Sequence, residues 1–66
     1  MTIVVNGEGR EAPEAVTVLG LLETIGIAPG RVAVEVNGRI VRRADFQRVT
    51  LHERDEVEVV HFVGGG

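Results

Sequence analysis

The chain has no cysteine, no lysine, no tyrosine and no tryptophan, and its only aromatic residues are two phenylalanines. Without cysteine it has no disulfide framework, no thiolate zinc site, no iron–sulfur cluster and no cysteine nucleophile. This absence fits a reducing compartment. Because all seven basic residues are arginine, the chain cannot be joined to copies of itself through side-chain isopeptide bonds. We therefore expect any chemistry that it undergoes to take place at its ends.

Strongly basic stretches and long apolar runs are also missing. The formal net charge is −3, Arg42-Arg43 is the only basic pair, and Phe46 and Phe62 stand alone, so a nucleic-acid surface with stacking platforms is not expected. The apolar run at the N-terminus is too short for a signal or membrane segment. A chain of 66 residues makes one small domain. We expect a cytoplasmic protein, monomeric when free, with no membrane or nucleic-acid partner.

The first third of the chain predicts a hairpin followed by one helix. An apolar strand over Thr2–Asn6 stops at Asn6-Gly7, which reads as a hairpin turn together with Gly9. A weaker second strand runs from about Arg10 to Val16, and Pro13 inside it indicates an edge strand.

The helix is predicted from its cap and from its apolar stripe. Thr17 is a good N-cap, Gly26 suits the left-handed residue past the helix end, and Pro29 blocks continuation. We expect the small size of Gly20 to let the helix approach the sheet closely. The apolar stripe follows the spacing i, i+3, i+4 and i+7 and comprises Val18, Leu21, Leu22 and Ile25.

The next segment predicts a second hairpin. Valines at 32, 34 and 36 alternate with other residues, as in a half-buried strand, and Asn37-Gly38 is the strongest hairpin signal in the chain. A two-residue turn there pairs Val34 with Val41 and turns Val41 to the core. A turn one residue longer, with a glycine bulge, would bury Ile40 instead. We favour the two-residue turn.

The rest of the chain predicts a single helical turn over 43–47 held by Phe46, a brief strand over 49–51, a polar turn over 52–55 and a last strand from Glu56 to about Phe62. In that strand Val57 and Val59 face inward, which leaves Val60 and Phe62 outward unless a β-bulge turns Phe62 back. One helix packed on a mixed sheet of four to five strands is the ubiquitin-like β-grasp, an α+β fold. We divide the chain into a domain over 1–61 and a flexible tail over 62–66.

The tail ends in Gly64, Gly65 and Gly66, directly after the last apolar strand. Glycine has no Cβ, so such a tail can enter a channel too narrow for other residues and leaves its carboxylate open to attack. A frayed end or a cloning scar is the alternative interpretation. The four residues past Phe62 span roughly 13 Å when extended, enough to place a carboxylate deep in a partner's active site.

Four segments together resemble the ThiS family, the bacterial sulfur carrier proteins of thiamine biosynthesis. They are Val5-Asn6-Gly7, Val16-Thr17-Val18 with Leu21-Leu22, the run 36–41 with Arg43, and the run 57–66, which ends in HFVGGG. The resemblance covers the whole chain. Two positions depart from the family pattern: Arg42 stands where proline is common, and Arg54 stands in place of a turn glycine, which leaves the geometry of that turn open.

The resemblance implies a carrier rather than an enzyme. An E1-like activating enzyme would adenylate the Gly66 carboxylate, a persulfide sulfur donor would convert it to a thiocarboxylate, and thiazole synthase would accept the sulfur. The chain has no phosphate-binding loop, so ATP and magnesium would be used by the activating partner, and the chain itself would bind no cofactor. We expect Val60, Phe62 and Val63 to contact partners, with Phe62 as the anchor.

Other functions remain open at this stage. A related carrier could deliver sulfur to molybdopterin, tungsten cofactor or transfer RNA, or the chain could be a ubiquitin-like protein modifier. A β-grasp interaction module with an inert tail is a third class. His52 and His61 match no metal-ligand spacing, so we assign them surface or structural roles and expect no metal site.

Overall fold

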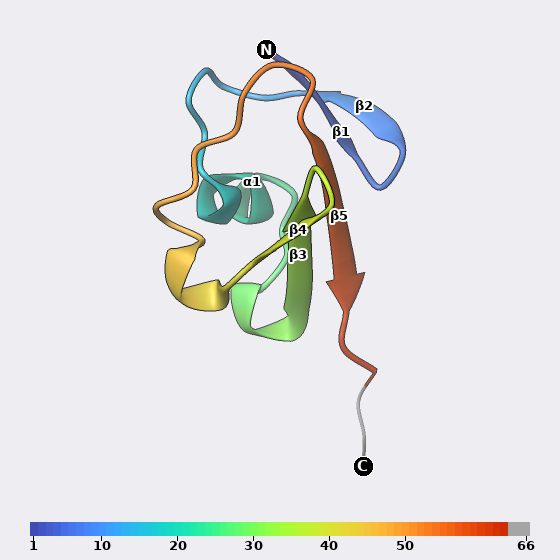
Figure 1. The fold of residues 1–66 in the computed structure, drawn as a ribbon, viewed down its shortest axis with the longest axis vertical. Helices are drawn as coiled ribbons and strands as arrows, with labels where there is room; N and C mark the ends of the chain where they lie inside the picture. The colour runs from blue at the N-terminus through green and yellow to red at the C-terminus, as the bar shows by residue number, and fades with distance from the viewer. Residues whose placement is uncertain (64–66) are drawn as a thin grey trace.

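The computed structural model describes residues 1–63 and shows one helix packed on a five-stranded mixed sheet of strand order β2-β1-β5-β3-β4 (Figure 1). The β-grasp prediction is confirmed. Its elements are β1 (Thr2–Val5), β2 (Glu8–Glu11), α1 (Val18–Thr24), the 3-10 turn η1 (Pro29–Arg31), β3 (Val32–Val36), β4 (Arg39–Val41), the 3-10 turn η2 (Arg43–Asp45) and β5 (Glu56–His61). Within residues 1–63, no helix is long and apolar enough to cross a membrane.

The first hairpin is tighter than the sequence predicted. Asn6 and Gly7, at φ 49° and 83°, make the turn alone, and β2 begins at the next residue. Gly9 therefore lies in the ladder opposite Val4 rather than in the turn. The predicted second strand from Arg10 to Val16 was wrong in its bounds because β2 ends at Glu11, before Pro13. Its position at an edge of the sheet is confirmed.

Helix α1 follows its predicted cap but not the predicted role of Gly20. The Thr17 hydroxyl accepts a hydrogen bond from the Gly20 N–H at 3.0 Å, and Gly26 is left-handed at φ 74°. A Cβ on Gly20 would lie 3.0 Å from Cγ2 of Val16 and 3.4 Å from the Thr17 hydroxyl oxygen. Gly20 is therefore packed closely against the residues just before the helix, and the expectation that it lets the helix approach the sheet was wrong.

The second hairpin has the favoured two-residue turn. Val34 lies opposite Val41, and Ile40 is 76% exposed, so Val41 and not Ile40 faces the core side. The brief strand predicted over 49–51 was wrong: only an isolated bridge between Thr17 and Thr50 forms there. That segment pairs with the chain before α1, where the Leu51 N–H donates to the Val16 carbonyl at 2.8 Å, rather than with the sheet.

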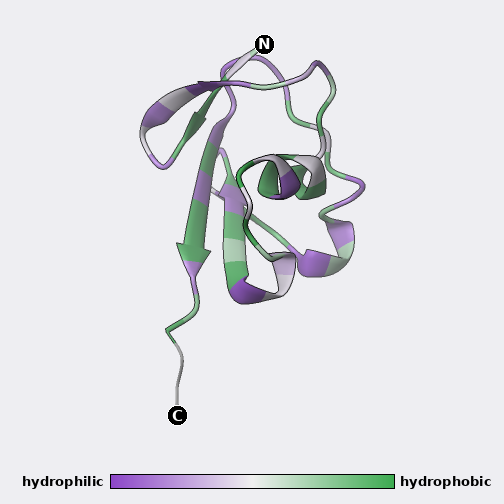
Figure 2. Ribbon diagram, turned by 180° about the vertical axis from the view of Figure 1, so that it is seen from behind, coloured by the Kyte–Doolittle hydropathy of each residue, from purple (hydrophilic) through white to green (hydrophobic). Residues whose placement is uncertain are grey.

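The core lies between α1 and one face of the sheet, so the other face of the sheet is left uncovered by the helix (Figures 1 and 2). Phe46, just after η2, is 3% exposed and closes the core beside α1, as predicted. Twelve apolar side chains make up the core: Ile3, Val5, Ala12, Val18, Leu21, Leu22, Val32, Val34, Phe46, Leu51, Val57 and Val59.

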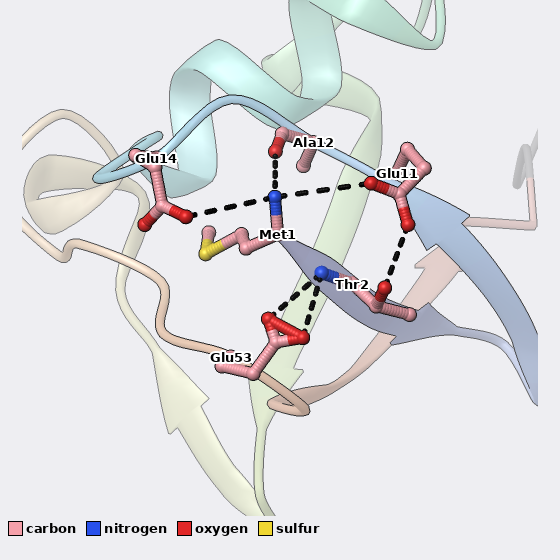
Figure 3. A network of polar contacts seen from close by, with 6 residues as sticks. All are labelled: Met1, Thr2, Glu11, Ala12, Glu14 and Glu53. Carbon is pink, nitrogen blue, oxygen red and sulfur yellow. Dashed lines mark hydrogen bonds and ion pairs between the residues drawn. The ribbon is translucent and has the colours of Figure 1, made fainter.

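A polar network fixes the start of β1 (Figure 3). The Met1 ammonium donates to the Ala12 carbonyl at 2.9 Å and lies 3.9 Å from a Glu11 carboxylate oxygen and 3.8 Å from one of Glu14. The Thr2 N–H donates to both carboxylate oxygens of Glu53, at 3.0 and 2.9 Å. This end of the molecule lies opposite the end at which β5 stops (Figure 1).

Candidate functional site

Strand β5 is the middle strand of the sheet and leads directly to the C-terminal residues. It pairs with β1 in parallel on one edge and with β3 in antiparallel on the other. Successive side chains of a strand point to opposite faces of the sheet. Val57 and Val59 are 1% and 6% exposed and face α1, as predicted, while Glu58 and Val60 face outward.

The apolar side chains at the end of β5 are exposed. Val60 is 59%, Phe62 63% and Val63 95% exposed. The Phe62 N–H donates to the Arg31 carbonyl at 3.0 Å, which carries the pairing with β3 one residue beyond β5 and keeps the alternation. Phe62 therefore stays outward, and the alternative in which a β-bulge buries it does not occur. The predicted site residues Gly64, Gly65 and Gly66 lie outside the described residues.

Two further apolar residues lie on this outer face and were not predicted as part of the site. Ala33 of β3 lies directly opposite Val60, and Ile40 of β4 lies opposite Glu35, one strand further out. Side chains that face each other across strands in this way share one surface. The favoured hairpin register turns Ile40 outward, but only the strand order places β3 beside β5 and β4 next to β3 on the same face.

The outer face is acidic next to its apolar part. Glu35 and Glu58 are direct cross-strand partners, and Glu56 follows on the same face of β5. Within the described part of the chain, none of these three carboxylates forms an ion pair. Like charges directly opposite each other in a sheet are destabilising. Charge therefore concentrates toward the start of β5, while apolar side chains dominate toward its end.

The two asparagines of the hairpin turns hold β5 through their side chains, which the sequence analysis missed. The Asn6 amide accepts a hydrogen bond from the Val59 N–H at 2.7 Å and donates to the Val59 carbonyl at 3.1 Å. The Asn37 amide accepts from the Glu56 N–H at 2.9 Å and donates to the Asp55 carboxylate at 3.0 Å. Asn-Gly signals a turn in any sequence, but the partners of its side chain depend on which strand passes nearby.

The two histidines lie at the surface, in agreement with the prediction. His52 has an 80% exposed side chain, with Nδ1 3.8 Å from the Asp55 carboxylate, and His61 is exposed at the end of β5. Over residues 1–63, no group of three or more histidine, aspartate or glutamate side chains is placed to hold a metal ion.

A shallow pocket lies on the helix side of the molecule. It holds about 200 Å³, which is below the roughly 300–1,000 Å³ typical of small-molecule sites. The pocket is formed by Leu19, Pro29, Arg43, Ala44, Phe46 and Gln47. None of these residues belongs to the outer face of the sheet.

Comparison with known proteins agrees with this arrangement. Residues 3–66 match the ThiS family. The chain belongs to the ThiS family. The crystal structure of a thiamine biosynthesis protein (ThiS) from Geobacter metallireducens superposes with a TM-score of 0.87 at 35% identity, over the full length of both chains.

Relatives of known name include a ThiS protein and two thiazole synthases. The sulfur carrier protein ThiS of Bacillus subtilis is 40% identical over 50 residues, which are 76% of either chain. A thiazole synthase of Magnetococcus marinus is 48% identical over all 66 residues of this chain, which match 20% of that protein. The chain thus spans about a fifth of the length of the thiazole synthases that it matches.

The two positions that depart from the ThiS pattern keep the backbone that the pattern requires. Arg42 lies at φ −67°, the value to which proline is locked. Arg54 lies at φ 67°, in the left-handed region where glycine is favoured. The turn at Arg54, whose geometry the sequence left open, thus has the left-handed backbone of a glycine turn although its residue is arginine.

Proposed function

We propose that this chain carries sulfur for the thiazole ring of thiamine as a thiocarboxylate on Gly66, and that it acts as a substrate of its partner enzymes rather than as a catalyst. Family membership carries the proposal. The described fold supports it, because the exposed apolar end of β5 lies directly before the terminal glycines in the sequence.

The chemistry requires activation by a partner. A terminal carboxylate is ionised at neutral pH and is a poor electrophile. Attack of a carboxylate oxygen on the α-phosphorus of ATP would release pyrophosphate and give the acyl-adenylate. A persulfide sulfur would then attack the acyl carbon and displace AMP, and a thiol would cleave the resulting S–S bond, leaving the thiocarboxylate and a disulfide. ATP and magnesium would be held by an E1-like enzyme, which would supply the charge stabilisation.

The outer face offers a docking surface for these partners. Val60 and Phe62 are exposed apolar side chains of this face, the exposed Val63 follows them toward the reactive end, and Ala33 and Ile40 extend the apolar surface across β3 and β4. Clustered exposed apolar residues commonly mark an interaction site. Thiazole synthase is the proposed sulfur acceptor, because two proteins of that name contain a region similar to this chain.

Mass spectrometry of the intact chain tests the proposal. Incubation with an E1-like enzyme and ATP should give the adenylate, and a persulfide donor should then raise the mass by the difference between sulfur and oxygen. Fragmentation should place the sulfur on Gly66. Sulfur found at any other residue would rule the proposal out.

The length of the tail provides a second test. Deleting Gly66, or adding one alanine after it, would move the carboxylate by about 3 Å, so adenylation should slow by about 10²-fold or more. The melting temperature should hardly change, because no residue of the core is altered. A shortened chain that is adenylated at the normal rate would contradict the proposed role of the terminus.

A further inference from the structure

The edge of β5 that faces β1 is only partly covered by that strand. The parallel ladder between the two strands pairs Val4 with Glu56 and Val5 with Val57, and then β1 ends and turns away at Asn6. Backbone groups of alternate residues in a strand point to opposite edges. The N–H and carbonyl of Val59 point to this edge, beyond the end of β1.

The Asn6 side chain takes the place of the missing strand residue. Its backbone N–H donates to the Val57 carbonyl at 2.9 Å, and its amide then pairs with both backbone groups of Val59, at 2.7 and 3.1 Å. A side-chain amide carries one acceptor and one donor group side by side, as a strand residue does. Asn6 thus extends the β1 edge to Val59 although the chain has already turned back.

Among residues 1–63, Val59 is the last residue of β5 with a hydrogen bond on this edge. On the opposite edge, the last bond runs from the Phe62 N–H to the Arg31 carbonyl at 3.0 Å. The end of β5 is therefore hydrogen-bonded on both of its edges. The exposed Phe62 makes the bond to Arg31 itself, and the exposed Val60 lies between Val59 and Phe62, so the same bonds hold the backbone of both residues.

We propose that Asn6 is a positioning residue for the reactive C-terminus: its amide fixes the end of β5 and so aligns the tail with the docked body. This inference rests on the proposed sulfur carrier function. If partner enzymes bind the outer face, the terminal carboxylate reaches their active site correctly only when β5 leaves that face in a fixed direction. Loss of the Asn6 amide should therefore slow the chemical step as well as weaken docking.

Asn37 provides a matched control within the same molecule. It too is the first residue of an Asn-Gly turn, its φ of 51° is close to the 49° of Asn6, and its side chain also bonds to β5. Its partners, however, are Glu56 at the start of the strand and Asp55 just before it, at the opposite end of β5 from the tail. Glycine tolerates the left-handed conformation, so Asn6→Gly and Asn37→Gly both keep their turns and remove only side-chain bonds.

Hydrogen exchange measured by NMR on the full chain tests the structural part. In Asn6→Gly the Val59 amide should exchange about tenfold faster than in the parent, the factor expected for one lost hydrogen bond of ordinary strength. In Asn37→Gly the protection of the Val59 amide should change only as much as global stability does. Equal exchange at Val59 in the two variants would overturn the inference.

Single-turnover adenylation with saturating activating enzyme tests the functional part. With both variants fully folded, the maximal rate of Asn6→Gly should fall about tenfold, since displacements near 1 Å at a reacting group can cost up to about 10²-fold. Asn37→Gly should keep the maximal rate of the parent. Equal maximal rates for the two variants would overturn the positioning role, whereas a parent chain that is not adenylated at all would instead refute the proposed function.

Discussion

The two faces of the sheet differ although they share the same strands. On the inner face Val57 and Val59 are almost completely buried under α1, whereas on the outer face Val60 and Phe62 are more than half exposed. Both sets belong to one short stretch, and their side chains alternate. One face therefore supplies folding stability while the other is exposed, so folding stability and the proposed partner binding can be separated by substituting neighbouring residues.

The two phenylalanines should give the largest contrast. Phe46→Ala should cost about 3–5 kcal/mol of folding stability, because it empties a fully packed position. Phe62→Ala should leave the melting temperature nearly unchanged and weaken binding to the activating enzyme at least roughly thirtyfold, the equivalent of about 2 kcal/mol at an anchor residue.

Melting curves and calorimetric titration on both variants measure these effects. A Phe62→Ala protein that unfolds easily but binds normally once folded would show that Phe62 serves the core. It would also remove the distinction between the two faces at this position.

Val59 and Val60 give a sharper but smaller contrast, because they are adjacent and chemically identical. Val59→Ala should lower the free energy of unfolding by about 1.5–2 kcal/mol, since two methyl groups leave a buried site. Val60→Ala should change it by less than about 0.5 kcal/mol, as is usual at a surface position, and should weaken partner binding. Urea denaturation of both variants would settle this, and equal losses of stability would contradict the assignment of faces.

The smallest expected effect concerns the cross-strand pair of Glu35 and Glu58. Glu58→Gln should raise the free energy of unfolding by about 0.2–1 kcal/mol, because it removes a like-charge contact. The gain should shrink in high salt, where exposed charges are screened. Urea titrations at low and high ionic strength measure it. A variant that is less stable than the parent at low salt would show that the outer carboxylates do not repel each other.

Much of the fold could be predicted from local patterns. The cap at Thr17, the left-handed Gly26, the two-residue turn at Asn37-Gly38 and the burial of Phe46 all followed from residue chemistry and spacing, and all are confirmed. The errors had one local cause and one tertiary cause. The start of β2 depended on a turn shorter than expected, and the segment at 49–51 pairs with the chain before α1 instead of joining the sheet.

The candidate site was predicted only in part, because tertiary pairing decides which residues join it. Alternation along β5 was enough to place Val60 and Phe62 outward, and the glycine tail was visible in the sequence itself. Ala33 and Ile40 could not be assigned to the same surface, nor Asn6 to Val59, because each pairing joins segments more than 20 residues apart or depends on strand order.

The sequence alone determined much of the local structure of this protein: which residues cap and end the helix, that Asn37-Gly38 forms a two-residue turn, and which side of β3 and of β5 faces the core. These properties depend on φ preferences, side-chain hydrogen bonds and periodicity within a few residues. Only the tertiary structure decided that β5 lies between β1 and β3, that two hairpin asparagines hold it, and that carboxylates and apolar side chains from three strands share one face. Those features depend on contacts between distant segments, and the free energy of packing the whole sheet against α1 selects them together.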